Sequence, residues 1–409
     1  MEYPHPASRD VYKRQTIQRI NLKLIFNLIR KHQSHTRVEL AKKTGLSAAT
    51  VTNIVNNLLH IGLLYEYPME PHSVGRRSIG LKINYGRFHI IHLRITSSNI
   101  FLGRYDLQGK QLNHKNFSYT VETNRKDLLN KVKSVIKTEL NSRLDPPILG
   151  IGMSLPGPYD KHHTFETIGE LINWDDINIC EELHKDLHIP VYAENDANIG
   201  ALYEWWSDET ITDKDTLVYI TLSEGTGSGI VSSGMLLRGK QGVAGEIGHM
   251  SVDISGPKCK CGNRGCLELY TSTTALLREA QKQASCSTST ILNPQCTKKD
   301  FFSAVKNGDP VACDIFQNAL NYLGAGIVNI IYLYNPSIIV FGDEMVTYGT
   351  GDILLEYVKN YVKERVHSQL FNNLSMKLST INGDPALFGA GVLVLNNISD
   401  ILFDQNLFS

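Results

Sequence analysis

The feature that most constrains this fold is a tight turn between two capped helices near the N-terminus. Thr36, with Glu39 three residues later, forms a capping box that predicts a short helix over 37–44. Gly45 suits the left-handed conformation that ends such a helix, and Ser47 is a typical cap for the next one. Helices joined by so short a turn cross at a steep angle, which is the arrangement that places a helix in the major groove of DNA.

Apolar spacing extends this pattern into a winged helix-turn-helix. The third helix is predicted from Ala48 to about Ile61, and short strands are predicted at 63–65 and 79–83. Between the strands, Gly75 precedes Arg76 and Arg77, a combination suited to a narrow minor groove, although solvated loop arginines would look the same. The core of the first two helices is predicted at Ile20, Leu22, Ile25, Leu28, Ile29, Val38, Leu40 and Ala41. The DNA-facing side chains of the third helix are predicted to be Ser47, Thr50, Thr52, Asn53 and Asn56.

The charge distribution supports a nucleic-acid role for this end of the chain. The formal net charge is +0, but residues 16–87 carry eleven Lys or Arg and three acidic side chains, which leaves +8 there and −8 elsewhere. A basic end on an acidic body is typical of a DNA-binding module joined to another domain, and a merely solvated basic face is the alternative. The predicted outward face of the third helix has no Lys or Arg, so we expect the wing to supply the attraction to phosphate.

Three of the seven cysteines crowd into eight residues. Cys259, Cys261 and Cys266 follow His249 in the chain, and this spacing predicts a closed tetrahedral zinc site rather than a disulfide. A closed site leaves no position for a reactive water, so we expect the zinc to be structural. Three unrelated cysteines are the alternative interpretation.

The remainder of the chain alternates strands and helices, which predicts an α/β architecture. Residues 323–336 are typical of a buried helix leading to a strand, and residues 284–297 of an exposed loop. Strands are predicted at 90–95, 100–105, 148–153, 191–193, 216–222, 228–231 and 338–341, and helices at 125–140, 197–206 and 386–395.

With these motifs, residues 16–395 resemble the ROK family of repressors, open reading frames and kinases, and within it the clade of N-acetylglucosamine and glucose-regulon repressors. The resemblance implies a two-lobed actin/hexokinase-like (ribonuclease H-like) body with its ligand in the cleft. We therefore expect a winged helix-turn-helix over 16–87, a sugar-sensor body over 88–395 whose C-terminal helix returns to the first lobe, and a tail over 396–409. Asp10–Gln15 resembles a translated sequencing-library adapter, so residues 1–15 are expected to be non-native or disordered.

The resemblance also implies which side chains bind a sugar. Asn195 and Asp196 stand where the family's kinases bind sugar, and Asp196 occupies the general-base position, here expected to be vestigial. Glu246, His249 and Glu268 are the other implied sugar ligands. His249 would then act twice, with one ring nitrogen on zinc and the other donating to a sugar hydroxyl.

A kinase motif is missing. The family's kinases carry Asp-x-Gly-x-Thr on the first strand pair, but Arg94 stands where the Asp should be and Thr96 where the Gly should be. Arg reverses the charge that organises metal and phosphates, and Thr adds a side chain where the backbone must approach them. The Gly-rich loop 224–229 is retained, while the family's late Gly-Gly adenine loop is altered at 341–344. We therefore expect no useful kinase activity.

Together these features predict a sugar-responsive repressor that is not an enzyme. Its expected partners are double-stranded operator DNA, a sugar or sugar phosphate, and further copies of itself in a homodimer or tetramer. A cytoplasmic location without membrane insertion is expected, because no run of 18 apolar residues occurs. Two alternatives remain at this point: a sugar kinase with an appended DNA reader, and an interaction module captured on a membrane transporter subunit.

Overall fold

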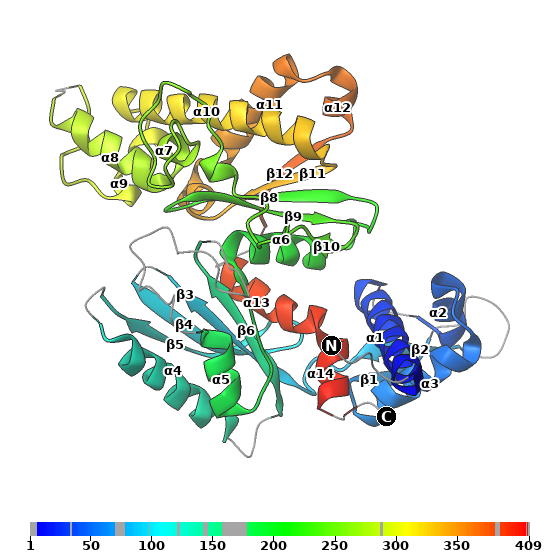
Figure 1. Ribbon diagram of the computed structural model, residues 1–409. Helices are drawn as coiled ribbons and strands as arrows, with labels where there is room; N and C mark the ends of the chain where they lie inside the picture. Colours follow the sequence, from blue (N-terminus) through cyan, green and yellow to red (C-terminus); the bar gives the residue numbers. More distant parts are fainter. Residues whose placement is uncertain are drawn as a thin grey trace. The chain divides into compact units, whose positions relative to one another are not determined.

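The computed structural model describes residues 6–32, 35–69, 78–96, 98–120, 123–141, 146–157, 178–286, 289–380, 385–405 and 407. These residues fall into two compact units (Figure 1). The first unit draws on Met1–Met153, Ile179–Ala193 and Ala390–Ser409, and the second on Ser154–Asn178 and Glu194–Gly389. The wing arginines Arg76 and Arg77 lie outside the described residues.

The N-terminal part of the first unit is a winged helix-turn-helix, as predicted. The capping box is confirmed, because the backbone N–H of Glu39 donates to the Thr36 hydroxyl and the Glu39 carboxylate accepts from the Thr36 N–H at 2.8 Å. Gly45 adopts φ 70°, and the Ser47 side chain caps the third helix. The elements are α1 (Pro6–His32), α2 (Arg37–Thr44), α3 (Ala48–His60), β1 (Leu64–Pro68) and β2 (Ile79–Ile83), the last two paired antiparallel.

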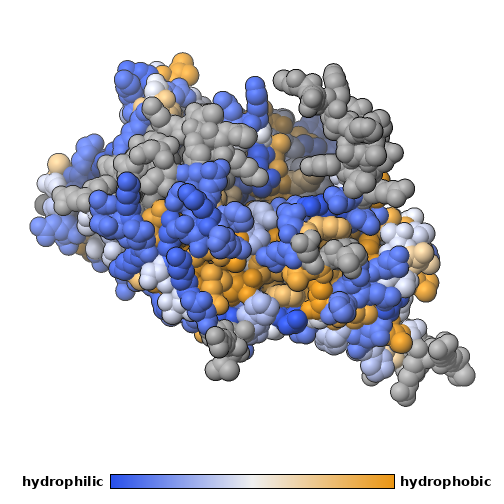
Figure 2. All heavy atoms as spheres, turned by 60° about the horizontal axis from the view of Figure 1, so that its bottom comes forward, coloured by the Kyte–Doolittle hydropathy of each residue, from blue (hydrophilic) through white to orange (hydrophobic). Residues whose placement is uncertain are grey.

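Two predicted core residues of this domain are wrong. Ile20 is 60% exposed and Val38 is 78% exposed. Successive helix residues are about 100° apart, so Ile20 points nearly opposite to Leu22, which is buried. On the two-turn helix α2 only Leu40 is fully buried. Exposed apolar side chains are not unusual: in the view of Figure 2, apolar patches lie between polar ones, as is normal for a folded surface.

The rest of the first unit is a mixed five-stranded sheet in the order β5-β4-β3-β6-β7. Helices α4 and α5 lie on one face and α13 on the other (Figure 1). A Cβ on Gly152 of β6 would come within 1.8 Å of the Ala390 carbonyl oxygen, so only glycine lets α13 approach this closely. The elements are β3 (His89–Ile95), β4 (Asn99–Asp106), β5 (Gln111–Ser118), α4 (Arg125–Leu140), β6 (Ile148–Leu155), α5 (Ile179–Leu187), β7 (Val191–Asn195), α13 (Pro385–Asn396) and α14 (Ile398–Asp404).

The second unit holds the second sheet, in the order β10-β9-β8-β11-β12. Helix α6 packs on one face, and helices α7 to α11 cover the other (Figure 1). Its strands are β8 (Thr216–Leu222), β9 (Thr226–Ser232), β10 (Met235–Leu236), β11 (Ile338–Gly342) and β12 (Ser375–Leu378). Its helical elements are α6 (Asp196–Ser207), η1 (Ile247–His249), α7 (Glu268–Thr271), α8 (Thr273–Ala284), α9 (Lys298–Lys306), α10 (Pro310–Tyr334), η2 (Val346–Thr350), α11 (Gly351–Arg365) and α12 (Ser368–Asn372).

Two details of the second unit differ from the sequence-based expectation. The segment 284–297 is not uniformly exposed, because Leu292 and Cys296 are buried in the helical core. Helix α10 is confirmed as a buried helix, but Tyr332 near its end is 57% exposed. Among the described residues, no single helix is long and apolar enough to cross a membrane; only the pair α13 and α14 meets that test jointly, with a 54° bend between them.

Candidate metal and ligand site

The segment that follows η1 folds into a small loop that gathers the predicted metal ligands. Ser251 forms an isolated bridge with Cys266, and Lys258 forms one with Arg264. Within the turn, the Cys259 N–H donates to the Asn263 carbonyl at 2.8 Å. The chain therefore reverses tightly between the cysteines, and this reversal returns Cys266 to the neighbourhood of His249.

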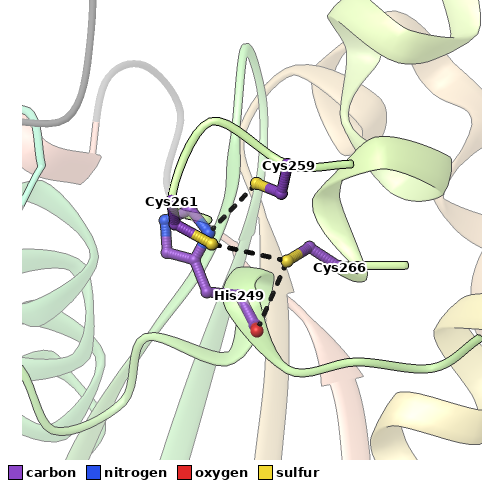
Figure 3. Close-up of side chains that lie close together, drawn as sticks. All are labelled: His249, Cys259, Cys261 and Cys266. Carbon is purple, nitrogen blue, oxygen red and sulfur yellow. Dashed lines mark hydrogen bonds between the residues drawn. The ribbon is translucent and has the colours of Figure 1, made fainter. Parts of the chain in front are cut away.

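His249, Cys259, Cys261 and Cys266 form one cluster (Figure 3). Their ligand atoms all lie within 4.8 Å of one another. His249 Nδ1 lies 3.7 Å from Cys259 Sγ, and Cys261 Sγ lies 3.6 Å from Cys266 Sγ. A tetrahedral ion with bonds of about 2.3 Å to sulfur and about 2.1 Å to nitrogen spaces its ligand atoms about 3.5–3.8 Å apart. The donor set and its spacing therefore fit a metal ion such as zinc.

The surroundings of two of the three thiols disfavour the thiolate form. Burial, together with hydrogen bonding to Cys259 and Cys261, raises the pKa of the Cys266 thiol to about 12. Burial also raises the pKa of the Cys259 thiol. Thiolates are the metal-binding form, so an ion entering this cluster must displace protons and compensate the negative charge that remains.

The Asn195 side chain is held at both ends by protein groups. Its Oδ1 accepts from the backbone N–H groups of Ala197 and Asn198 and so caps α6. Its Nδ2 donates to the Gly157 carbonyl at 2.7 Å. The next residue, Asp196, opens α6 at the positive end of the helix dipole, which favours a carboxylate there.

Three predicted carboxylates gather around this helix start and the metal cluster. Burial, followed by repulsion from Asp196 and Glu268, raises the pKa of Glu246 to about 7. Glu268 Oε1 lies 3.4 Å from His249 Nδ1 and 3.5 Å from Cys259 Sγ. In Figure 3 the second ring nitrogen of His249 points away from the sulfur atoms. The second unit therefore brings the five predicted sugar ligands and the four predicted metal ligands into one neighbourhood.

The outward face of α3 matches the predicted set only in part. Ser47, Asn53 and Asn56 are exposed, while Thr50 and Thr52 are half-buried. Sequence reasoning missed Arg37 of α2, which donates to Asn56 Oδ1 at 3.2 Å and pairs with Glu66 at 2.6 Å. A cation therefore does reach the outward face of α3, from a neighbouring helix.

Sequence reasoning also missed an ion pair between a half-exposed arginine and a buried carboxylate beside the candidate ligand site. Arg238 Nε donates to the carboxylate of Glu194 at 2.6 Å, and Glu194 is only 2% exposed. The signal for it was the position of Glu194, an acid directly before Asn195 at the end of a strand.

Comparisons with known proteins place this architecture. The model of the ROK family matches residues 91–397, and a model described as winged helix-turn-helix DNA-binding matches residues 18–64. The chain belongs to the ROK family. The relatives of this ROK protein include the xylose repressor of Bacillus subtilis (strain 168), which is 28% identical over 96% of this chain and 99% of its own length. The N-acetylglucosamine repressor of Escherichia coli O6:H1 is 27% identical over 92% of this chain and 93% of its own length.

Two further comparisons bear on the body and on the whole fold. A glucokinase of Halalkalibacterium halodurans is 32% identical, over 68% of this chain and 87% of its own length. The crystal structure of a ROK family transcriptional regulator, described as a homolog of the E. coli MLC protein, superposes with a TM-score of 0.82. It is 24% identical and covers 96% of this chain and 99% of that one. The winged helix-turn-helix and the ROK body therefore occur together in repressor relatives. Xylose repressors match this chain at least as well as the N-acetylglucosamine repressor, whose clade was predicted from sequence.

Proposed function

We propose that this ROK protein is a sugar-responsive transcriptional repressor. The observation that carries the proposal is the joining of a winged helix-turn-helix to a ROK body that retains amide, carboxylate and imidazole groups in one neighbourhood. Such groups recognise the hydroxyls of a sugar through directed hydrogen bonds. The protein would bind operator DNA in the cytoplasm as a homodimer or tetramer, because two-fold related readers match two operator half-sites.

In this function each group of side chains has a separate task. The exposed Asn53 and Asn56 would read base edges, while Arg37 and the wing residues Arg76 and Arg77 would contact phosphates or the minor groove. Asp196, Glu246 and Glu268 would accept hydrogen bonds from sugar hydroxyls, and His249 would donate one from Nε2. Asn195 would contribute by fixing the start of α6. A zinc ion held by His249, Cys259, Cys261 and Cys266 would supply a rigid cross-link and no reactive water.

Two features support the absence of phosphoryl transfer. The turn that replaces the phosphate loop is closed on itself, because the Thr96 N–H donates to the Asn99 carbonyl and the Asn99 N–H donates to the Thr96 hydroxyl. The Tyr119 hydroxyl also donates to the Thr96 carbonyl. These groups already have partners inside the protein, and Arg94 replaces the acid that would organise a metal–nucleotide complex.

The altered adenine loop is the second feature. Asp343 replaces a glycine there and adopts φ 68°, a conformation that favours glycine. Its carboxylate accepts from the hydroxyls of Thr221 and Tyr219. Glu344 beside it accepts from Thr273 and pairs with Lys298 at 2.7 Å. The Gly-Gly sequence expected of an adenine loop is therefore replaced by two acidic residues whose side chains are held by protein groups.

Repression is tested with the purified protein and a DNA fragment from upstream of its own operon. We expect specific binding by fluorescence anisotropy, and a change in that binding with one of D-xylose, D-glucose or N-acetyl-D-glucosamine. The ligand can act only through its differential affinity for two conformations, so the same sugar must also raise the thermal midpoint.

A sugar kinase with an appended reader is the second candidate, because the glucokinase relative is 32% identical over the body. The same sugars with Mg²⁺ and ATP decide between the two. Phosphorylation of a sugar by a chain that ignores DNA would refute the repressor. Capture on a transporter subunit instead of a sugar is the remaining possibility, and a protein that no sugar stabilises would favour it.

A further inference from the structure

Glu194 is the most deeply buried carboxylate near the ligand site. It lies on β7 directly before Asn195 and is 2% exposed. One of its oxygens, Oε1, accepts from the Asn195 N–H and from Asn198 Nδ2, both at 3.1 Å. The other, Oε2, accepts from Arg238 Nε at 2.6 Å. The charge of the Glu194 carboxylate is therefore compensated by two N–H donors at the start of α6 and by the guanidinium of Arg238.

Arg238 belongs to a different segment, the loop that leaves β10 and leads to Glu246. The Arg238 carbonyl accepts from the Ala244 N–H at 3.1 Å, which closes this loop. Three glycines inside it, Gly239, Gly242 and Gly245, have φ between 69° and 94°. Glycine gives a loop little intrinsic rigidity, so the conformation of this one depends on contacts outside it.

The loop has anchors at both ends. At its end, the Gly245 carbonyl accepts from the N–H and the hydroxyl of Ser228, the latter at 2.8 Å. At its start, the side chain of Arg238 is the link to α6. Glu246 follows Gly245 directly, and after burial, repulsion from Asp196 contributes most to its raised pKa. The Arg238–Glu194 pair therefore ties the start of this loop to the residue that directly precedes α6.

We propose that Arg238 is a positioning residue of the effector site. Its ion pair with Glu194 holds the loop 237–246 against the start of α6, so that Glu246 faces the sugar together with Asp196. Arg238 itself does not touch the sugar. This inference rests on the proposed sugar-binding function. It means that Arg238 and Glu194, which do not contact the sugar themselves, preorganise the sugar site.

The primary test compares Arg238→Gln with Lys377→Gln in the full-length chain. Lys377 pairs with Asp208, the residue that directly follows α6, so the control removes an ion pair at the other end of the same helix. Calorimetric titrations use whichever of D-xylose, D-glucose and N-acetyl-D-glucosamine binds the unmodified protein. We expect Arg238→Gln to weaken binding by roughly tenfold or more, as for loss of a hydrogen-bonded charge, and Lys377→Gln to leave it unchanged.

A double variant separates positioning from stability. Arg238→Gln leaves the Glu194 carboxylate buried without its partner, which lowers the thermal midpoint as well. Glu194→Gln combined with Arg238→Gln removes that unpaired charge, so the midpoint should recover while the sugar affinity stays low. Recovery of affinity together with stability would show that the pair acts only on folding and would overturn the proposal.

Amide hydrogen exchange in the sugar-free protein tests the loop directly. Arg238→Gln should speed exchange over residues 239–246, and Lys377→Gln should not. Unchanged exchange and unchanged affinity in Arg238→Gln would overturn the positioning role while leaving sugar binding intact. An unmodified protein that binds none of the sugars would instead refute the proposed function, and the exchange result would then decide alone whether Arg238 holds the loop.

Discussion

At the scale of single residues, the cysteine cluster makes the most direct prediction. Cys261→Ser should remove one of four metal ligands, so bound zinc should fall well below one ion per chain. Loss of a structural metal site costs several kcal/mol at least, so the thermal midpoint of the second unit should also fall. Metal analysis by plasma mass spectrometry and a thermal scan measure both effects.

The matched control for this change is Cys286→Ser. Cys286 is exposed and lies outside the cluster, so its substitution should change neither the zinc content nor the midpoint. Equal zinc in both variants would mean that the four side chains do not bind the metal.

Glu246 makes a prediction about pH. Its pKa is raised from 4.5 to about 7 in the folded protein, so the folded state holds a proton that the unfolded state has already released. Between about pH 4.5 and 7, stability should therefore fall as pH rises, because unfolding releases that proton. Glu246→Gln cannot ionise, so its thermal midpoint should fall less over this range and exceed that of the unmodified protein at pH 8. Parallel midpoint-against-pH curves for the two proteins would contradict this account.

Residue chemistry explains why the metal ligands could be predicted from sequence and the Asn195 contacts could not. The four clustered side chains, which could hold a metal ion, are of types and spacings that few other structures use, so their pattern is informative by itself. Asn195 instead bonds to Gly157, which is 38 residues earlier in the chain. Nothing local encodes a partner so distant, and the same is true of Arg238 with Glu194, which are separated by 44 residues.

At the scale of elements, the helix starts marked by capping residues were predicted correctly, whereas one strand and one helix without such a local signal were not. The capping residues set the start of α2 and α3 correctly, because caps act within one turn of the helix. Strand β5 was missed, because it lies at the edge of its sheet, where six of its eight residues are exposed and two are half-buried, so no apolar alternation marks it. Residues 396–409 were expected to be a tail, yet Ile398–Asp404 form α14 with Ile401 and Leu402 fully buried.

Helix α3 carries a prediction about DNA recognition. Asn53 is exposed on its outward face and can pair with an adenine through both groups of its amide. Asn53→Ala should therefore cost about 1–3 kcal/mol on the operator and little on unrelated DNA, which relaxes sequence preference. Anisotropy titrations on the operator and on a scrambled duplex at one salt concentration measure the ratio. Equal weakening on both duplexes would show that Asn53 does not read a base.

At the scale of the whole molecule, the proposed function requires a connection between the sugar site and the winged helix-turn-helix. Helix α13 begins in the second unit, at Pro385, and ends in the first, because the two units divide between Gly389 and Ala390. Helix α14 follows it and contacts α1, the first helix of the reader. Arg19 of α1 pairs with two acids of α14, Asp400 and Asp404, each at 2.7 Å. Two consecutive helices, α13 and α14 with a 54° bend between them, therefore lie along the chain between the second unit and the contact with α1.

This connection predicts that Arg19 couples sugar binding to DNA binding, although it contributes little to the affinity for either ligand by itself. Its ion pairs are partly exposed and so contribute little to stability, about 0–1 kcal/mol each, which means that Arg19→Gln should remain folded. Operator affinity without sugar, and sugar affinity without DNA, should both stay near their unmodified values. The change in operator affinity that sugar causes should shrink, because coupling free energies are typically only about 1–3 kcal/mol and the link between α1 and α14 carries part of it. Arg365→Gln, which removes an exposed pair with Glu364 on α11, is the control and should respond fully. If sugar changed the operator affinity of Arg19→Gln as much as that of the unmodified protein, the coupling would run through another part of the fold. The contact between α14 and α1 would then be only structural.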